Sequence, residues 1–269
     1  MKYSRIDRRQ KNKSKTKWVI TSVVILLIAV GAIVYFSLNK NSAVDEPNLN
    51  VQSPVQNDGE KPTKSTEQPK VQEKVGKVES PEVDDAGYAL VKGTITEPTY
   101  IDGVLIANKK YPLPASYNPG EDKEALKAYK DMEKAAKKAG FTITAFSGFR
   151  SYDYQKELYD KYVARDGKGN ADRYSARPGH SEHQTGLAFD IGEVGREDLW
   201  LTAAFGETPA GQWLIQNAHQ YGFILRYPEG KEKITGFMYE SWHFRYLGQD
   251  MATNVYKSGK TLEEYLGIN

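Results

Sequence analysis

The chain has 269 residues, a formal net charge of +2 and no cysteine. This length leaves room for one domain of ordinary size plus accessory segments, because domains usually run to about 100–200 residues. The near-zero net charge predicts no polyanionic partner such as nucleic acid, and the lack of cysteine excludes disulfides, thiolate metal ligands and a lipid-modified N-terminal cysteine.

The first 38 residues predict a membrane anchor. Residues 1–17 form a basic segment, and Trp18–Leu38 follows with 21 residues and no charge. Roughly 20 apolar residues span a bilayer, and the positive-inside rule places residues 1–17 in the cytoplasm and the rest of the chain outside. A cleaved secretory signal is the alternative. Its apolar core is usually about 7–15 residues long, so the longer stretch favours an uncleaved, single-pass anchor.

Residues 39–85 have the composition of a disordered tether. They contain five Pro and sixteen charged residues but not one aromatic residue. Such a segment cannot bury enough apolar surface to offset the entropy lost on ordering. The folded domain is therefore expected at 86–269. It begins with an extended, turn-rich stretch, Gly87–Pro119, in which Asp102-Gly103 predicts a turn between Tyr100-Ile101 and Val104–Ile106.

Periodicity predicts helices and strands along the rest of the domain. The helix predicted over 122–139 has an apolar face at three- and four-residue spacing, formed by Leu126, Tyr129, Met132, Ala136 and Ala139. A second helix is expected from its N-cap, Ser151. The other expected elements are a strand at 141–146, a buried strand at Leu187–Ile191, a polar loop over 165–179, a helix from its N-cap Thr208 to Gly222, and strands at Phe223–Tyr227 and Phe237–Leu247. Thr261 and Glu264 have the spacing of a capping box, which predicts a short final helix. Strands and helices without a repeating βαβ rhythm favour the α+β class, with a small, mainly antiparallel sheet flanked by helices.

Two short clusters carry the residues suited to chemistry. The first, Ser181–Asp190, contains His183 and Asp190, and the second contains Glu240 and His243. Two His and one Asp suffice for a catalytic Zn²⁺, which takes three protein ligands and keeps a fourth position for water. Glu240 is then left over as a base beside that water.

The geometry of the second cluster poses a problem. Residues three apart on a regular strand point to opposite faces, yet Glu240 and His243 have to face one site. A bulge near Ser241-Trp242 would bring them together, and so would a strand that starts after Glu240. His180 forms the pattern His-x-x-His with His183, which is the alternative metal pair, but Asp190 is the better-matched ligand. His219 has no matched partner and is expected to be structural.

Arg150 lies where the strand at 141–146 gives way to the following helix. Its guanidinium presents a rigid fork that can hold a carboxylate with two hydrogen bonds. A structural salt bridge is the alternative role.

The pattern Ser-x-His-x-x-Gly-x-Ala-x-Asp at Ser181–Asp190, followed by Glu-x-Trp-His at Glu240–His243, resembles the VanY/LdcB group of zinc carboxypeptidases. These enzymes trim D-Ala from the stem peptides of peptidoglycan, and their clan includes lysostaphin-type enzymes and the hedgehog signalling domain. The resemblance extends over roughly residues 87–267. It implies that Arg150 engages the substrate near its terminal carboxylate and that Gln155 and Ser181 line the same pocket.

The resemblance predicts a zinc carboxypeptidase whose catalytic domain faces the cell wall. Two alternatives stay open: an endopeptidase that cuts peptidoglycan cross-bridges, and a non-catalytic module in which zinc is structural. The spare carboxylate of Glu240 favours catalysis, because a structural zinc needs no base. The sequence does not choose between the L,D bond of a tetrapeptide and the D,D bond of a pentapeptide.

Overall fold

A computed structural model describes residues 81–269. In this part of the chain no helix has the length and apolar character needed to span a bilayer. The expected anchor at 18–38 and most of the expected tether lie outside the described residues, so both stay predictions.

The domain begins with contacts made by residues assigned to the tether on composition. Val83 forms an isolated bridge with Ala89, and Asp84 accepts hydrogen bonds from the backbone of Ala86 and Tyr88 and from the side chain of Arg177, at 2.6 Å. The folded contacts therefore start before residue 86. Short polar segments of this kind gain order from long-range partners that composition does not show.

A hairpin follows, formed by β1 (Thr99–Ile101) and β2 (Val104–Ile106). The two strands are antiparallel, and Asp102 and Gly103 both adopt positive φ angles in the turn between them. A two-residue turn with positive φ at both positions matches the right-handed twist of the flanking strands. The turn predicted from Asp102-Gly103 is confirmed.

The larger sheet has four strands in the order β3-β4-β6-β5. Every neighbouring pair is antiparallel, which confirms the predicted small antiparallel sheet. The strands are β3 (Ile143–Ser147), β4 (Ala188–Glu193), β5 (Phe223–Tyr227) and β6 (Glu240–Tyr246).

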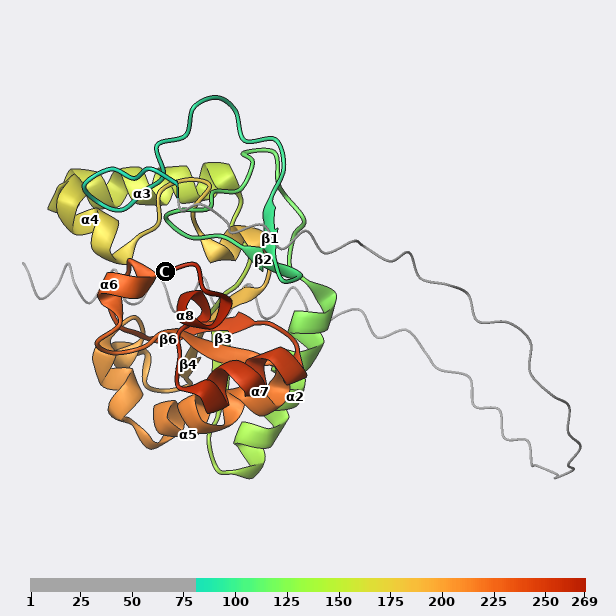
Figure 1. Cartoon of the computed structure of the whole chain (residues 1–269). Coiled ribbons are helices and arrows are strands. Elements are labelled where there is room, and N and C mark those ends of the chain that lie inside the picture. The colour runs from blue at the N-terminus through green and yellow to red at the C-terminus, as the bar shows by residue number, and fades with distance from the viewer. Residues whose placement is uncertain (1–80) are drawn as a thin grey trace, which may run out of the picture. The chain divides into compact units, whose positions relative to one another are not determined.

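Helices surround these strands (Figure 1). The α-helices are α2 (Lys123–Lys138), α3 (Tyr152–Asp166), α4 (Lys168–Tyr174), α5 (Pro209–Asn217), α6 (Glu232–Thr235), α7 (Gln249–Ser258) and α8 (Leu262–Leu266). Four short 3-10 turns join them, namely η1 (Glu182–Thr185), η2 (Glu197–Leu199), η3 (Ala203–Glu207) and η4 (Ala218–Tyr221). The predicted N-caps Ser151 and Thr208 and the capping box of Thr261 with Glu264 are all present.

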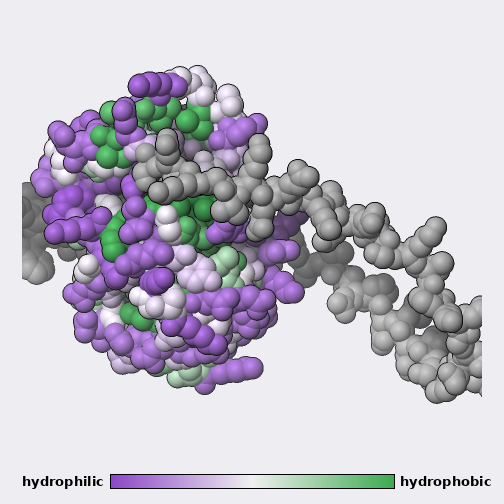
Figure 2. Space-filling view, viewed as in Figure 1, coloured by the Kyte–Doolittle hydropathy of each residue, from purple (hydrophilic) through white to green (hydrophobic). Residues whose placement is uncertain are grey.

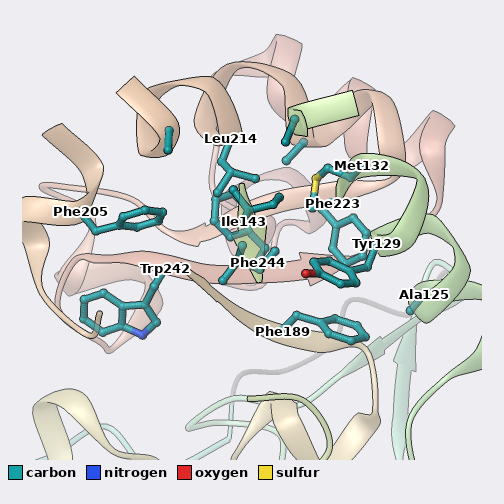
Figure 3. Packing of buried hydrophobic residues seen from close by; sticks show 14 residues of the cluster. Ala125, Tyr129, Met132, Ile143, Phe189, Phe205, Leu214, Phe223, Trp242 and Phe244 are labelled. Carbon is teal, nitrogen blue, oxygen red and sulfur yellow. The ribbon is translucent and has the colours of Figure 1, made fainter. Parts of the chain in front are cut away.

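One face of the four-stranded sheet carries the main hydrophobic core (Figure 3). Phe189 of β4, Phe223 of β5 and Phe244 of β6 are at most 1% exposed and pack with side chains from α2 and α5, among them Met132 and Leu214. A second cluster joins the β1–β2 hairpin to β5, α7 and α8. The sheet is therefore covered on both sides.

The outer surface is mainly hydrophilic on the face seen in Figure 2, where hydrophobic residues form separate patches. Helix α2 shows why: Tyr129, Met132 and Ala136 are buried as predicted, while its Lys and Glu residues point outward. Leu126 was expected on the buried face but is 37% exposed, and Ala125 takes its place.

The structure differs from the predicted elements in three places. The polar stretch 165–179 was expected to be a loop, but it contains α4, whose Asp172 accepts a hydrogen bond from Tyr159 of α3 at 2.7 Å. The helix that starts after Thr208 turns into η4 for its last turn. The last strand begins at Glu240, not at Phe237.

Candidate zinc site

Two of the three predicted zinc ligands lie on neighbouring strands. Asp190 of β4 pairs directly with His243 of β6 in the antiparallel ladder. Side chains of directly opposed residues project from the same face of a sheet, with Cβ atoms about 4.5–5.5 Å apart. The strand pairing therefore brings together residues that are 53 positions apart in the sequence.

The third predicted ligand, His183, comes from η1, which precedes β4. Gly186 ends this turn with φ 75°, and a Cβ added there would lie 2.1 Å from the carbonyl oxygen of Gly120. Only glycine fits this position. The glycine of the motif thus allows the chain to turn tightly from His183 into the strand that carries Asp190.

The three side chains could hold one metal ion. Their candidate ligand atoms all lie within 4.8 Å of one another, and all three residues are buried. His183 Nε2 is 3.3 Å from Asp190 Oδ2, and His243 Nδ1 is 3.3 Å from Asp190 Oδ1. Asp190 Oδ1 is buried and accepts no hydrogen bond from the described residues, which suits an oxygen that ligates a cation.

The outer nitrogens of both imidazoles are occupied by acceptors. Nδ1 of His183 lies 2.7 Å from the carbonyl oxygen of Gly148. A carbonyl oxygen only accepts, so Nδ1 carries the proton and Nε2 presents its lone pair to the site. Nε2 of His243 lies 3.4 Å from Glu182 Oε2, which leaves Nδ1 facing the site. Metal-binding histidines commonly have this arrangement.

Glu240 joins the same site through a bulge. The register between β5 and β6 pairs Leu225 with Phe244 and then Tyr227 with Glu240, so β6 contains two extra residues at this point. Glu240 Oε2 consequently lies 3.5 Å from His243 Nδ1. The sequence left open whether a bulge or a strand starting after Glu240 brings the two residues together. The structure has the bulge, and Glu240 is the first residue of the strand.

The charged groups of the site shift one another's pKa values. Burial raises the pKa of Glu240 to about 8. Burial alone would lower the pKa of His243, but the neighbouring carboxylates of Asp190 and Glu182 outweigh it and raise the pKa to about 9. Burial would raise the pKa of Asp190, yet the neighbouring His183, His243 and Arg150 hold it well below its usual range. Glu240 is thus the carboxyl group of the site whose affinity for a proton is raised by burial, as suits a group that accepts and later donates a proton.

Arg150 lies at the centre of the site, closer to the candidate ligands than expected. Its Nη2 donates to Asp190 Oδ2 at 2.8 Å and lies 2.9 Å from His183 Nε2. The guanidinium therefore lies directly against two of the three candidate ligands. Ser147 Oγ accepts from Nε and Nη2 of Arg150, and Gln155 Oε1 accepts from Nη1.

The site opens into a cavity of about 510 Å³. Its lining includes Tyr154, Gln155 and Leu158 of α3 as well as Met238 and Trp242. Ser181, Glu240 and the three candidate ligands also line it. The structure thus places every predicted site residue in or around one cavity.

The other two histidines are elsewhere. His180 Nδ1 lies 2.8 Å from the carbonyl oxygen of Asn108, and its ring packs edge-on against Tyr88. His219 stacks on Tyr256. Neither belongs to the metal-binding group found among residues 81–269.

Sequence reasoning missed four buried charged residues behind His243: Glu182, Arg226, Arg245 and Glu263. Glu182 stands inside the motif that carries His183, and the arginines occupy inward-facing positions of β5 and β6. Charged residues inside strands with otherwise apolar neighbours were the available signal, because such residues are almost never fully buried unless paired.

The donor set fits zinc. Two imidazoles and one carboxylate, with both imidazoles oriented by acceptors behind them, match the three-ligand catalytic sites of this metal. Sulfur is absent and the carboxylate is single, whereas Ca²⁺ prefers six to eight oxygen ligands.

Comparison with known families gives an independent result. The family model described as VanY, D-alanyl-D-alanine carboxypeptidase, matches residues 119–249. This segment contains the three candidate ligands, Glu240 and Arg150. The chain is also 37% identical over 238 residues to the protein YodJ of Bacillus subtilis strain 168, a match that covers 77% of this chain and 87% of YodJ.

Solved structures with the same fold include both kinds of carboxypeptidase. The L,D-carboxypeptidase DacB of Streptococcus pneumoniae is 50% identical, with a TM-score of 0.56 over 62% of this chain and 87% of DacB. The vancomycin-resistance D,D-pentapeptidase VanY of the VanB-type cassette, solved in complex with Zn(II), is 36% identical, with a TM-score of 0.53 over 60% of this chain and 97% of VanY.

Proposed function

The chain belongs to the VanY family of D-alanyl-D-alanine carboxypeptidases, and we propose that it acts within this family as a zinc-dependent L,D-carboxypeptidase. Its substrate is the peptidoglycan stem tetrapeptide, from which it removes the terminal D-Ala. The buried Glu240 beside three zinc ligands is the observation that carries the hydrolytic function. The higher identity to an L,D-carboxypeptidase than to a D,D-pentapeptidase favours the tetrapeptide.

In the proposed reaction His183, Asp190 and His243 hold the metal. Zinc at this position supplies Lewis-acid chemistry, because it lowers the pKa of a water molecule and polarises a carbonyl group. Glu240 accepts a proton from the attacking water and later donates it to the nitrogen of the leaving D-Ala. Peptide hydrolysis therefore consumes one water and leaves the charge of Glu240 unchanged at the end of the cycle.

The role proposed for Arg150 is to hold the terminal carboxylate of the substrate. Its guanidinium lines the same cavity as the candidate ligands, and Ser147 and Gln155 orient it there. Gln155 is 1% exposed and also donates to the carbonyl oxygen of Ala176 at 2.7 Å, so it is a fixed support. Ser181 lines the cavity next to the first ligand.

The proposed location follows from the sequence. Residues 1–17 are basic and 18–38 are apolar, so the chain is expected to be a single-pass protein of the cell membrane with its catalytic domain outside, facing the cell wall. A segment of about 47 residues at 39–85 has a typical reach of about 35–40 Å if it behaves as a flexible coil. Such a tether would let the domain reach stem peptides above the membrane.

Product analysis tests the proposal. The zinc-loaded full chain is incubated separately with a defined stem tetrapeptide, a pentapeptide and a cross-bridged dimer. The products, including any released amino acid, are then identified. Release of D-Ala mainly from the tetrapeptide is expected. Faster release from the pentapeptide would assign the chain to the D,D class. Cleavage of a cross-bridged dimer without release of a terminal residue would make it an endopeptidase instead.

A further inference from the structure

The most unusual feature outside the site itself is a group of four buried charges behind His243. Glu182, Arg226, Arg245 and Glu263 are each at most 2% exposed. Two carboxylates and two guanidiniums balance one another in formal charge. Burying ionised groups is costly unless they are paired, so an arrangement of four such groups next to a metal ligand calls for a functional explanation.

The two oxygens of Glu182 have different partners. Oε1 accepts from Arg226 Nε at 2.7 Å and from Arg245 Nη1 at 2.9 Å. Oε2 makes neither of these bonds and lies 3.4 Å from His243 Nε2. The arginines therefore fix the carboxylate through one oxygen and leave the other pointing at the outer nitrogen of the ligand.

The arginines are themselves held at their far ends. Arg226 Nη1 donates to Glu263 Oε2 of α8 at 2.9 Å, and Arg245 Nη2 donates to the carbonyl oxygen of Leu105 in β2 at 2.6 Å. Glu263 also accepts from Asn108. A continuous series of hydrogen bonds thus connects α8 and the β1–β2 hairpin, through the two arginines, to Glu182, which contacts His243.

We propose that Glu182 is the positioning residue of the metal site. It holds the proton of His243 on Nε2 and so presents Nδ1 to the cation, with Arg226 and Arg245 fixing its carboxylate. His183 has only a backbone carbonyl in the corresponding place, so His243 is the ligand whose tautomer depends on a side chain. Loss of such an outer partner typically lowers metal affinity or activity by about 10–100-fold.

The inference rests on the proposed function only in requiring a cation at His243. Zinc affinity is measured on the full chain by competition with a chelator, without any substrate. Glu182→Gln is expected to weaken zinc binding about 10–100-fold. A chain that binds zinc with this dependence but releases no D-Ala would overturn the proposed function and leave the inference standing.

Asp172→Asn is the matched control. It removes a carboxylate of similar burial that also binds an arginine, Arg177, but lies outside the group of charges around Glu182. It should lower the melting temperature while zinc affinity stays within about threefold of the wild type. Equal losses of zinc affinity in Glu182→Gln and Asp172→Asn, or no loss in Glu182→Gln, would reduce Glu182 to a structural role.

The tautomer of His243 can be measured directly, which tests the role of Glu182 even if Glu182→Gln fails to fold. The chain has four histidines, so ¹⁵N spectra of the zinc-loaded full chain can resolve each ring. His243 is expected to carry its proton on Nε2, and this proton should exchange faster in Glu182→Asp, whose shorter side chain keeps the charge. A proton on Nδ1, or unchanged exchange in Glu182→Asp, would overturn the proposal.

Discussion

The two faces of the four-stranded sheet are equally buried but differ in chemistry. Phe189, Phe223 and Phe244 face the apolar core (Figure 3), whereas Asp190, His243 and Arg245 project from the opposite face. Phe244 is 0% exposed and its neighbour Arg245 is 1% exposed. Residues next to each other in the sequence therefore project from opposite faces of the sheet, because side chains alternate along a strand.

This contrast shows how the fold separates stability from catalysis. On the apolar face, side chains contribute through area and shape, so replacements of similar volume are tolerated. On the charged face each group depends on a particular partner, because removing one partner leaves an uncompensated buried charge that strongly destabilises the folded protein. Substitutions at adjacent positions should therefore give effects of different kinds.

The largest effect is expected at the ligands. Replacing His183, Asp190 or His243 by Ala removes one of three protein ligands, so zinc content and hydrolysis should be lost together. Zinc stoichiometry and D-Ala release are measured on the same preparation. A variant that keeps full zinc content would remove its residue from the ligand set.

Glu240→Gln should abolish most of the hydrolysis without loss of zinc. The amide has nearly the same shape but cannot accept the proton from water, so the rate should fall by roughly 10²–10⁴-fold while zinc content stays complete. Parallel metal analysis and kinetics provide the check. If zinc is lost as in His183→Ala, Glu240 is a ligand; if the rate stays near that of the wild type, the base lies elsewhere.

Phe244→Ala tests the opposite face, one residue after His243. Deleting a fully buried aromatic side chain costs about 3–5 kcal/mol of the free energy of unfolding, because it leaves a cavity in the main cluster. Denaturant unfolding would measure this loss. Zinc affinity of the folded fraction should not change, and a parallel loss of affinity would show that the two faces are coupled.

Arg150→Lys should have a smaller effect, confined to catalysis. Lysine keeps the charge but lacks the fork that holds a carboxylate with two hydrogen bonds. Hydrogen bonds to charged groups contribute about 1.5–3 kcal/mol, so a rate loss of about 10–100-fold is expected. Amidation of the substrate's C-terminus should slow the wild type much more than the variant. Equal slowing would exclude Arg150 from carboxylate recognition.

The smallest effect is expected for Thr261→Ala, at the start of the helix that carries Glu263. Thr261 accepts from the backbone of Glu264, whose carboxylate accepts from the backbone of Thr261. Loss of an N-cap costs about 1 kcal/mol, so thermal unfolding should reveal a modest decrease in stability. Unchanged stability would mean that α8 is held by its packing and its two ion pairs alone.

Much of the fold could be predicted because its signals are local. The N-caps Ser151 and Thr208, the turn at Asp102-Gly103 and the capping box at Thr261 each depend on residues within a few positions of one another. The prediction failed for α4, whose polar sequence has no apolar periodicity and whose Asp172 is satisfied by Tyr159 and Arg177 from other segments.

The sequence by itself determined the residue types of the zinc site, because two imidazoles and a carboxylate in recognisable motifs have few other uses. It also required that Glu240 and His243 face one site, without saying how. The tertiary structure decided the bulge in β6, the position of Arg150 on the candidate ligands and the four buried charges behind His243. These features depend on strand register and on partners up to 155 positions apart, such as Asn108 and Glu263, and periodicity within one segment carries no information about either.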